Sequence, residues 1–274
     1  MMQVFRASSF GALWPASQTL WRREIVRFLR QRGRVVGALG TPLVFWVLVG
    51  AGLRDSFQIS AASRPMSYLE FSYPGAIAAI LLFTAIFSTI SVIDDRHAGF
   101  LQGVLVSPAP RAAIALGKIL GATTLAVGQA LLFLLLAPLA GIKLGAASVV
   151  ATIGAMCLSG FAVTGLGFAI AWRMESTQGF HAIMNLVLMP MLVLSGAFFP
   201  PSGSATWLRW IMSANPMTYS VSLFRHTLYL DADLARLSHG VSAWGALLAT
   251  AAFAIVTFVV SIRTVTRHRT KALQ

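Results

Sequence analysis

The chain has 274 residues, of which 57% are hydrophobic and only 11% are charged. Soluble domains carry about 45–50% apolar and about 25% charged residues, so this composition excludes a soluble enzyme, a disordered chain and a disulfide scaffold. The net charge is +13, which we attribute to basic residues that flank membrane spans rather than to nucleic-acid binding. The length suits one integral membrane domain over residues 1–274, with no appended soluble domain.

Residues 12–34, before the first apolar run, predict an amphipathic helix at the membrane interface. At 100° per residue, the apolar side carries Trp21 and Phe28, and the opposite side carries Arg23, Arg27 and Arg30. Such a helix lies in the plane of the interface with its apolar face in the lipid. The alternative is a simple orientation signal for the first span.

Six apolar runs follow, each long enough for the roughly 20 residues that one bilayer crossing takes. They cover residues 35–53, 74–93, 119–141, 147–172, 179–200 and 242–262. The sequence therefore predicts an all-α membrane protein with six transmembrane helices. None of the six runs contains Asp, Glu, Lys or Arg, which argues against a carrier driven by its own ion or proton coupling.

The distribution of positive charge predicts the orientation. With both termini inside, the inner segments hold 15 Lys and Arg residues and the outer segments hold 6. Because inner loops carry the excess of Lys and Arg, we expect both termini in the cytoplasm. The location we expect is the plasma membrane, that is, the bacterial inner membrane.

Two loops differ from simple connections. The inner loop, residues 94–118, contains an apolar-faced segment that prolines end, and such a short helix needs a partner surface or the bilayer to cover it. The outer loop, residues 201–241, is rich in Trp, Met and Tyr, side chains that suit the membrane interface. We expect short re-entrant or interfacial helices there.

Polar side chains at the second span form one helical stripe, with Thr84, Ser88, Ser91 and Asp95 at i, i+4, i+7 and i+11. They line either a helix interface or a solute path. The sequence has no GxxxxGK[ST], HExxH or GxSxG motif, and its single cysteine offers no metal site by itself. We therefore expect no catalytic residue, no metal and no cofactor bound by this chain.

These segments together resemble the membrane subunit of type-2 ABC exporters, a family that includes permeases for drug resistance, polysaccharide export and nodulation signals. The stretches that carry the resemblance are Asp95-Arg96 with Gly99, Ser107-Pro108, Arg111 and Gly117-Lys118; Leu194-Ser195-Gly196-Ala197-Phe198-Phe199-Pro200; and Asn215-Pro216-Met217-Thr218-Tyr219, running to Arg225. One departure is that Ala98 and Phe100 stand where the family often has Glu and Thr.

The resemblance implies that residues 94–118 form a coupling helix that docks on a cytoplasmic ATPase. The coupling candidates are Arg96, Gly99, Phe100, Leu101, Pro108, Arg111 and Lys118. It also implies that the region after the fifth span caps the outer end of a path between two permease chains. The candidates there are Phe198, Phe199, Pro216 and Tyr219. For the two phenylalanines, the alternative is that they anchor the fifth span at the interface.

We therefore expect a non-enzymatic permease subunit of an ATP-driven exporter for an amphipathic, drug-like, lipid-linked or glycan solute. The resemblance implies a second permease chain, identical or related, and two ATPase subunits that bind the ATP and Mg²⁺. Three alternatives remain: a membrane scaffold or assembly subunit without a transport path, a passive channel, and an ion or heme export permease of the same architecture.

Overall fold

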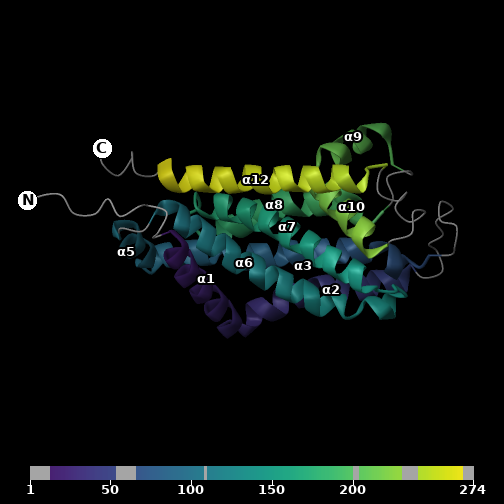
Figure 1. Ribbon diagram of the computed structural model, residues 1–274, viewed down its shortest axis with the longest axis horizontal. Coiled ribbons are helices and arrows are strands. Elements are labelled where there is room, and N and C mark those ends of the chain that lie inside the picture. The colour runs from purple at the N-terminus through teal and green to yellow at the C-terminus, as the bar shows by residue number, and fades with distance from the viewer. Residues whose placement is uncertain (1–12, 54–65, 108–109, 200–203, 230–239, 268–274) are drawn as a thin grey trace, which may run out of the picture.

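The computed structural model describes residues 13–53, 66–107, 110–199, 204–229 and 240–267, and within these ranges the regular structure is helical (Figure 1). The helices are α1 (Leu13–Arg30), α2 (Arg32–Gly52), α3 (Tyr68–Thr89), α4 (Ser91–His97), α5 (Phe100–Val106), α6 (Arg111–Leu134), the 3₁₀ helix η1 (Ala137–Ala140), α7 (Ala146–Ala171), α8 (Thr177–Leu192), the π turn η2 (Val193–Ala197), α9 (Thr206–Ala214), α10 (Pro216–Leu228) and α12 (Ala243–Arg267).

Six of these helical segments are long and apolar enough to cross a membrane, as the sequence predicts. Their ends differ from the prediction. The second span begins at Tyr68 rather than residue 74, because the Ser67 hydroxyl accepts a hydrogen bond from the Glu70 amide and caps the helix. It continues through α4 to His97. The third span begins at Arg111, directly after Pro110, so the inner loop is shorter than residues 94–118.

The second span is the centre of the bundle. Of its most apolar stretch, 89% of residues are buried, against 22% for α2 and 28% for α12. The Tyr73 ring stacks on Phe133 of α6 at a centroid distance of 4.7 Å, and its hydroxyl donates to the Phe133 carbonyl. Trp46 of α2 meets both rings edge-on. This aromatic cluster joins three spans with geometries that aromatic pairs prefer.

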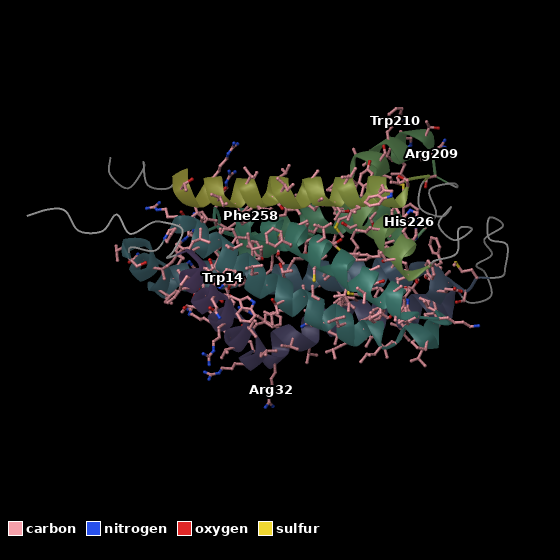
Figure 2. The ribbon with its side chains drawn as sticks, viewed as in Figure 1. Trp14, Arg32, Arg209, Trp210, His226 and Phe258 are labelled. Atoms are coloured by element: carbon pink, nitrogen blue, oxygen red, sulfur yellow. The ribbon has the colours of Figure 1, made fainter. Side chains whose placement is uncertain are left out.

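The two ends of the bundle carry different segments. In Figure 1, α5 and the C-terminal end of α12 lie at one end, and α9 and α10 lie at the other. Figure 2 shows Arg209 and Trp210 of α9 pointing away from the bundle, and Trp207 is exposed as well. Such exposed Trp side chains on a short helix suit a membrane–water interface, which is compatible with the interfacial helix expected there.

Candidate functional site

The end of the bundle that carries α5 contains a network of buried charges centred on Asp95 of α4. The Asp95 side chain is fully buried, and both its oxygens accept hydrogen bonds from the Arg23 guanidinium of α1, each at 2.7 Å. Arg27 of α1 also donates to Asp95, and the Lys118 ammonium of α6 donates to it at 2.6 Å. Such bidentate, charge-assisted bonds are among the strongest in proteins. One carboxylate therefore holds three elements together.

Two further acidic residues complete the network. Glu24 of α1 is buried and accepts a hydrogen bond from Lys118 at 2.7 Å. Asp94 is partly exposed and accepts from Arg34 of α2 at 3.0 Å and from Arg27 at 3.3 Å. The hydrogen bonds from Arg23 to Asp95 raise the pKa of Arg23 above its ordinary value.

Small residues allow α1 to lie directly on α6. A Cβ atom at Gly117 would lie 2.7 Å from the Ser17 carbonyl oxygen, and one at Gly121 would lie 2.7 Å from the Glu24 Cβ. Because these glycines are four residues apart, they lie on one face of α6, and α1 packs closely against that face. The Trp21 indole adds a hydrogen bond to the Thr124 hydroxyl at 3.0 Å.

The contacts of α1 correct one part of the amphipathic prediction. The helix exists, and Phe28 on its apolar side is buried, but Arg23 and Arg27 of the basic side point to carboxylates of the bundle rather than to solvent. Of the predicted basic residues, Arg30 is exposed, whereas Arg23 and Arg27 are partly buried. Buried carboxylates explain the difference, because they need cationic partners.

Helix α5 is held against this network by its first two residues. The Arg23 guanidinium lies 3.6 Å from the centroid of the Phe100 ring, a cation–π contact, and Leu101 is buried in the core. Gly99 precedes α5 with a φ of 72°, a left-handed conformation that glycine adopts without strain. At the other end of α5, Val106 is 85% exposed.

The remaining coupling candidates in the described residues are also held by other residues of the same chain. Arg96 donates to the carbonyl oxygens of Trp172 and Met174, which fixes α4 to the connection between α7 and α8. Arg111 donates to the Val265 carbonyl of α12 at 3.3 Å. Pro108 lies outside the described residues. Arg96, Phe100, Leu101 and Lys118 are thus turned inward, because each finds a partner inside the bundle.

The polar stripe of the second span lies in the contact between α3 and α6. The Thr84 hydroxyl donates to the Gln129 side-chain carbonyl at 2.7 Å, and the Ser88 hydroxyl donates to the Thr84 carbonyl. Ser91 accepts a long bond from Lys118 at 3.4 Å. Thr84, Ser88 and Ser91 are buried, and Thr84 joins α3 to α6.

The outer candidates surround the end of the fifth span. The helix ends where Gly196 adopts a φ of 76°, and the buried Arg225 of α10 donates to the Gly196 carbonyl at 2.7 Å. Phe198 meets Phe45 of α2 edge-on at 5.2 Å, while Phe199 is partly buried. The backbone that leaves the helix is thus satisfied by a side chain of the protein, as membrane depth requires.

Helix α10 begins with a cap of its own. Asn215 accepts from the Met217 amide and donates to the Met191 carbonyl at 2.6 Å, and Pro216 occupies the first helical position. The Tyr219 hydroxyl donates to the Ser213 carbonyl, so it ties α10 to α9. These contacts join α9, α10 and the fifth span at the end of the bundle away from α5.

Sequence reasoning missed Glu24, Asp94, Arg34 and the central position of Asp95. One signal was available, because Glu24 is the only acidic residue among the first 34, on a helix otherwise rich in arginine. A lone acidic residue on such a helix indicates an ion pair. The burial of Arg225 had no local signal, because its partner Gly196 lies on another element.

Comparisons with known proteins agree on one family. The family model described as ABC-2 type transporter matches residues 15–229. The putative transport permease ycf38 of Cyanophora paradoxa is 27% identical over 222 residues, which cover 77% of this chain and 74% of that protein. Nodulation protein J of Rhizobium leguminosarum bv. viciae is 26% identical over 230 residues, covering 83% and 86% of the two chains. The daunorubicin resistance ABC transporter permease protein DrrB1 of Streptomyces coeruleorubidus is 24% identical over 216 residues, covering 77% and 73%.

Proposed function

Because the chain belongs to the ABC-2 type transporter family, we propose that this transport permease is the membrane subunit of an ATP-driven exporter. Its solute is an amphipathic, drug-like, lipid-linked or glycan molecule. The names of two relatives, a nodulation protein and a daunorubicin resistance permease, support this class of solute. ATP and Mg²⁺ belong to separate ATPase subunits, and this chain performs no hydrolysis.

The observation that carries the proposal is that one side of α5 is buried against the bundle and the other side is exposed. Its buried side is fixed by Phe100 and Leu101, whereas Gln102, Gly103 and Val106 on its other side are exposed. This exposed side of α5, with Val106 85% exposed, is open to a partner surface. We assign that surface to the ATPase, with the inward-facing residues positioning the helix.

The described contacts provide a route from α5 to the centre of the bundle. Helix α4 continues directly from α3, the most buried span, and Asp95 on α4 binds α1 and α6. A push on α5 therefore moves α4 together with α1 and α6, because breaking one contact would expose buried charge. Closure of two ATPase subunits would in this way change the arrangement of the spans.

The proposed assembly contains two permease chains and two ATPase subunits in a bacterial inner membrane, with α5 and both chain ends on the cytoplasmic side. The 15 to 6 division of Lys and Arg between inner and outer segments supports this orientation. The exposed apolar faces of α2, α8 and α12 are available for lipid and for a second permease chain.

The test places a charge on the exposed side of α5. We expect Val106→Asp to leave the permease folded in the membrane but to reduce co-purification with its ATPase and the solute-stimulated ATPase activity by about tenfold. This corresponds to about 1.4 kcal/mol, because the new carboxylate would lose its hydration in the interface without gaining a partner. The matched control is Ala205→Asp, which adds the same charge at the exposed start of α9, at the other end of the molecule. Equal ATPase association by both variants would refute the docking assignment.

A further inference from the structure

A cavity of about 220 Å³ lies inside this one chain, between α2, α3 and the segment formed by α8 and η2. Five aromatic side chains contribute to its wall: Phe45, Trp46, Tyr68, Phe83 and Phe198. Aliphatic side chains of α8 and η2, among them Met189 and Leu192, close the other side. The wall is apolar, and no Asp, Glu, Lys, Arg or His lines it.

The buried polar side chains of the wall have no hydrogen left to offer a ligand. The Trp46 indole donates to the Leu69 carbonyl at 3.1 Å, and the Ser72 hydroxyl donates to the Tyr68 carbonyl at 2.7 Å. The Tyr68 hydroxyl donates to the Phe198 carbonyl at 3.0 Å. A polar ligand group would lose its hydration without a donor in return. The buried part of the cavity therefore favours hydrocarbon over groups that need a hydrogen-bond donor, and Thr41, the other hydroxyl of the lining, is exposed.

The size of the cavity limits what it holds. An apolar cavity of about 150 Å³ stays dry and binds benzene, so 220 Å³ corresponds by proportion to roughly nine carbon atoms. Pockets that enclose a whole drug-sized molecule measure about 300–1,000 Å³. Only part of an amphipathic solute fits, and the apolar wall selects its hydrocarbon part.

The helices beside the cavity expose apolar side chains to the outside of the molecule. Leu48 on α2 is 65% exposed, and Leu186 on α8 is 76% exposed, while Phe45 and Val193 belong to the cavity wall and are partly accessible as well. A hydrocarbon chain dissolved in the bilayer can therefore reach the cavity between α2 and α8 without passing a charged group.

We propose that this cavity is a subsite for the hydrocarbon tail of the exported amphiphile, whose polar head stays outside the apolar wall. The proposal rests on the proposed function, and it narrows the solute class to molecules with a tail or apolar ring of about nine carbons. Filling an empty cavity restores the contacts that its wall otherwise lacks, which favours a bound tail over a void.

The first experiment maps the tail with light. The full chain in lipid nanodiscs is mixed with a decyl glycoside that carries a diazirine on its terminal carbon, irradiated, digested and analysed by mass spectrometry. We expect labelling to concentrate on wall residues of α2, α3 and α8. Labelling that is spread evenly over the exposed apolar faces, or none at all, overturns the proposal.

Matched variants separate the cavity from other apolar surfaces. Ala79→Phe fills the cavity from α3, and Ala76→Leu fills it with a smaller side chain in case the first variant fails to fold. We expect about tenfold less cavity labelling, which corresponds to about 1.4 kcal/mol. The control is Gly128→Leu, in an open groove between α6 and α7 where an added Cβ meets no atom within 4 Å. It should leave cavity labelling unchanged.

A second probe distinguishes the tail of a solute from the tail of a membrane lipid. A phospholipid with the same diazirine in one acyl chain should label the exposed faces, and the glycoside should displace it from the cavity wall. If the phospholipid labels the wall and the glycoside does not compete with it, the cavity is a lipid site and the proposal is wrong. Because labelling needs no ATPase, this result is independent of whether Val106→Asp affects ATPase association.

Discussion

Asp95 carries one negative charge between three cationic side chains, and two of its partners come from a helix more than 60 residues earlier in the chain. Removal of the Asp95 carboxylate is costly because Lys118 remains buried with one partner fewer. Lys118, which is 3% exposed, would keep only Glu24 as a carboxylate partner. The stability of this end of the bundle therefore depends on one residue.

We predict that Asp95→Asn lowers the free energy of unfolding by about 3–5 kcal/mol, the range found when one member of a buried pair is removed. The measurement is unfolding of the purified chain in detergent, followed by tryptophan fluorescence. The matched control is Asp94→Asn, whose side chain is partly exposed and should contribute less than about 1 kcal/mol. Equal losses from the two variants would contradict the central role of Asp95.

The connection between α4 and α5 depends on the backbone conformation of one residue, Gly99. We predict that Gly99→Ala costs about 1–2 kcal/mol locally, because a side chain disfavours a φ of 72° while no atom lies within 4 Å of the added Cβ. Hydrogen exchange over residues 98–107 should become faster. Gly103→Ala, inside α5 and equally free of contacts, should slow exchange or leave it unchanged. Faster exchange in both variants would mean that backbone strain is not the cause.

At the scale of elements, the packing of α1 on α6 depends on two small residues. Gly117 and Gly121 let the helices approach so closely that a Cβ atom at either position would overlap the backbone or Cβ atoms of α1. Backbone atoms cannot move aside as a flexible side chain can, so the helix as a whole must shift. The network of Asp95 then loses the alignment of its arginines.

We predict that Gly117→Ala and Gly121→Ala each destabilise the chain by about 1–3 kcal/mol, the usual cost of overpacking, and release α1 from α6. The measurement is trypsin cleavage after Arg22 and Arg23, which should become faster. The control on the same helix is Gly128→Ala, where the added methyl group meets no atom. Unchanged cleavage of both α1-facing variants would show that the close approach is not required.

The spans could be predicted from the sequence because a run of about 20 consecutive apolar residues matches one crossing of the bilayer. Their ends could not, since caps and charged partners decide them. The Ser67 cap starts α3 at Tyr68, ahead of the uniformly apolar run. Lys118, predicted in a loop, lies inside α6 because Glu24 and Asp95 satisfy its charge.

The site was only partly predictable for a related reason. The motif residues Gly99, Phe100 and Arg96 could be found because they are close together in the sequence. The inward orientation of the Phe100 and Arg96 side chains could not be predicted, because their partners are distant in the sequence. Arg23 covers the Phe100 ring, and Arg96 donates to backbone carbonyls of a distant turn. The apolar cavity had no sequence signal at all, since its wall combines residues from three separate spans.

At the scale of the whole molecule, the arrangement predicts that Ser107 and Ser204 face opposite sides of the membrane, since α5 and α9 lie at opposite ends of the bundle (Figure 1). In a Cys157→Ser background, Ser204→Cys should react with a membrane-impermeant maleimide in intact cells. Ser107→Cys should react only after the membrane is opened, because the inner segments carry 15 of the 21 positive charges. Labelling of Ser107→Cys in intact cells would reverse the proposed orientation.

The second span is 30 residues long from Tyr68 to His97, which is about 45 Å at 1.5 Å per residue. The hydrocarbon core of a bilayer is only about 30 Å thick, so this span is long enough to extend beyond the core as a lever arm. A tilt of about 5° about one end of a 45 Å rod displaces the other end by about 4 Å. A modest tilt of the second span, imposed at α5, would thus move its other end, at Tyr68, by about the width of a hydrocarbon chain. Tyr68 is part of the cavity wall.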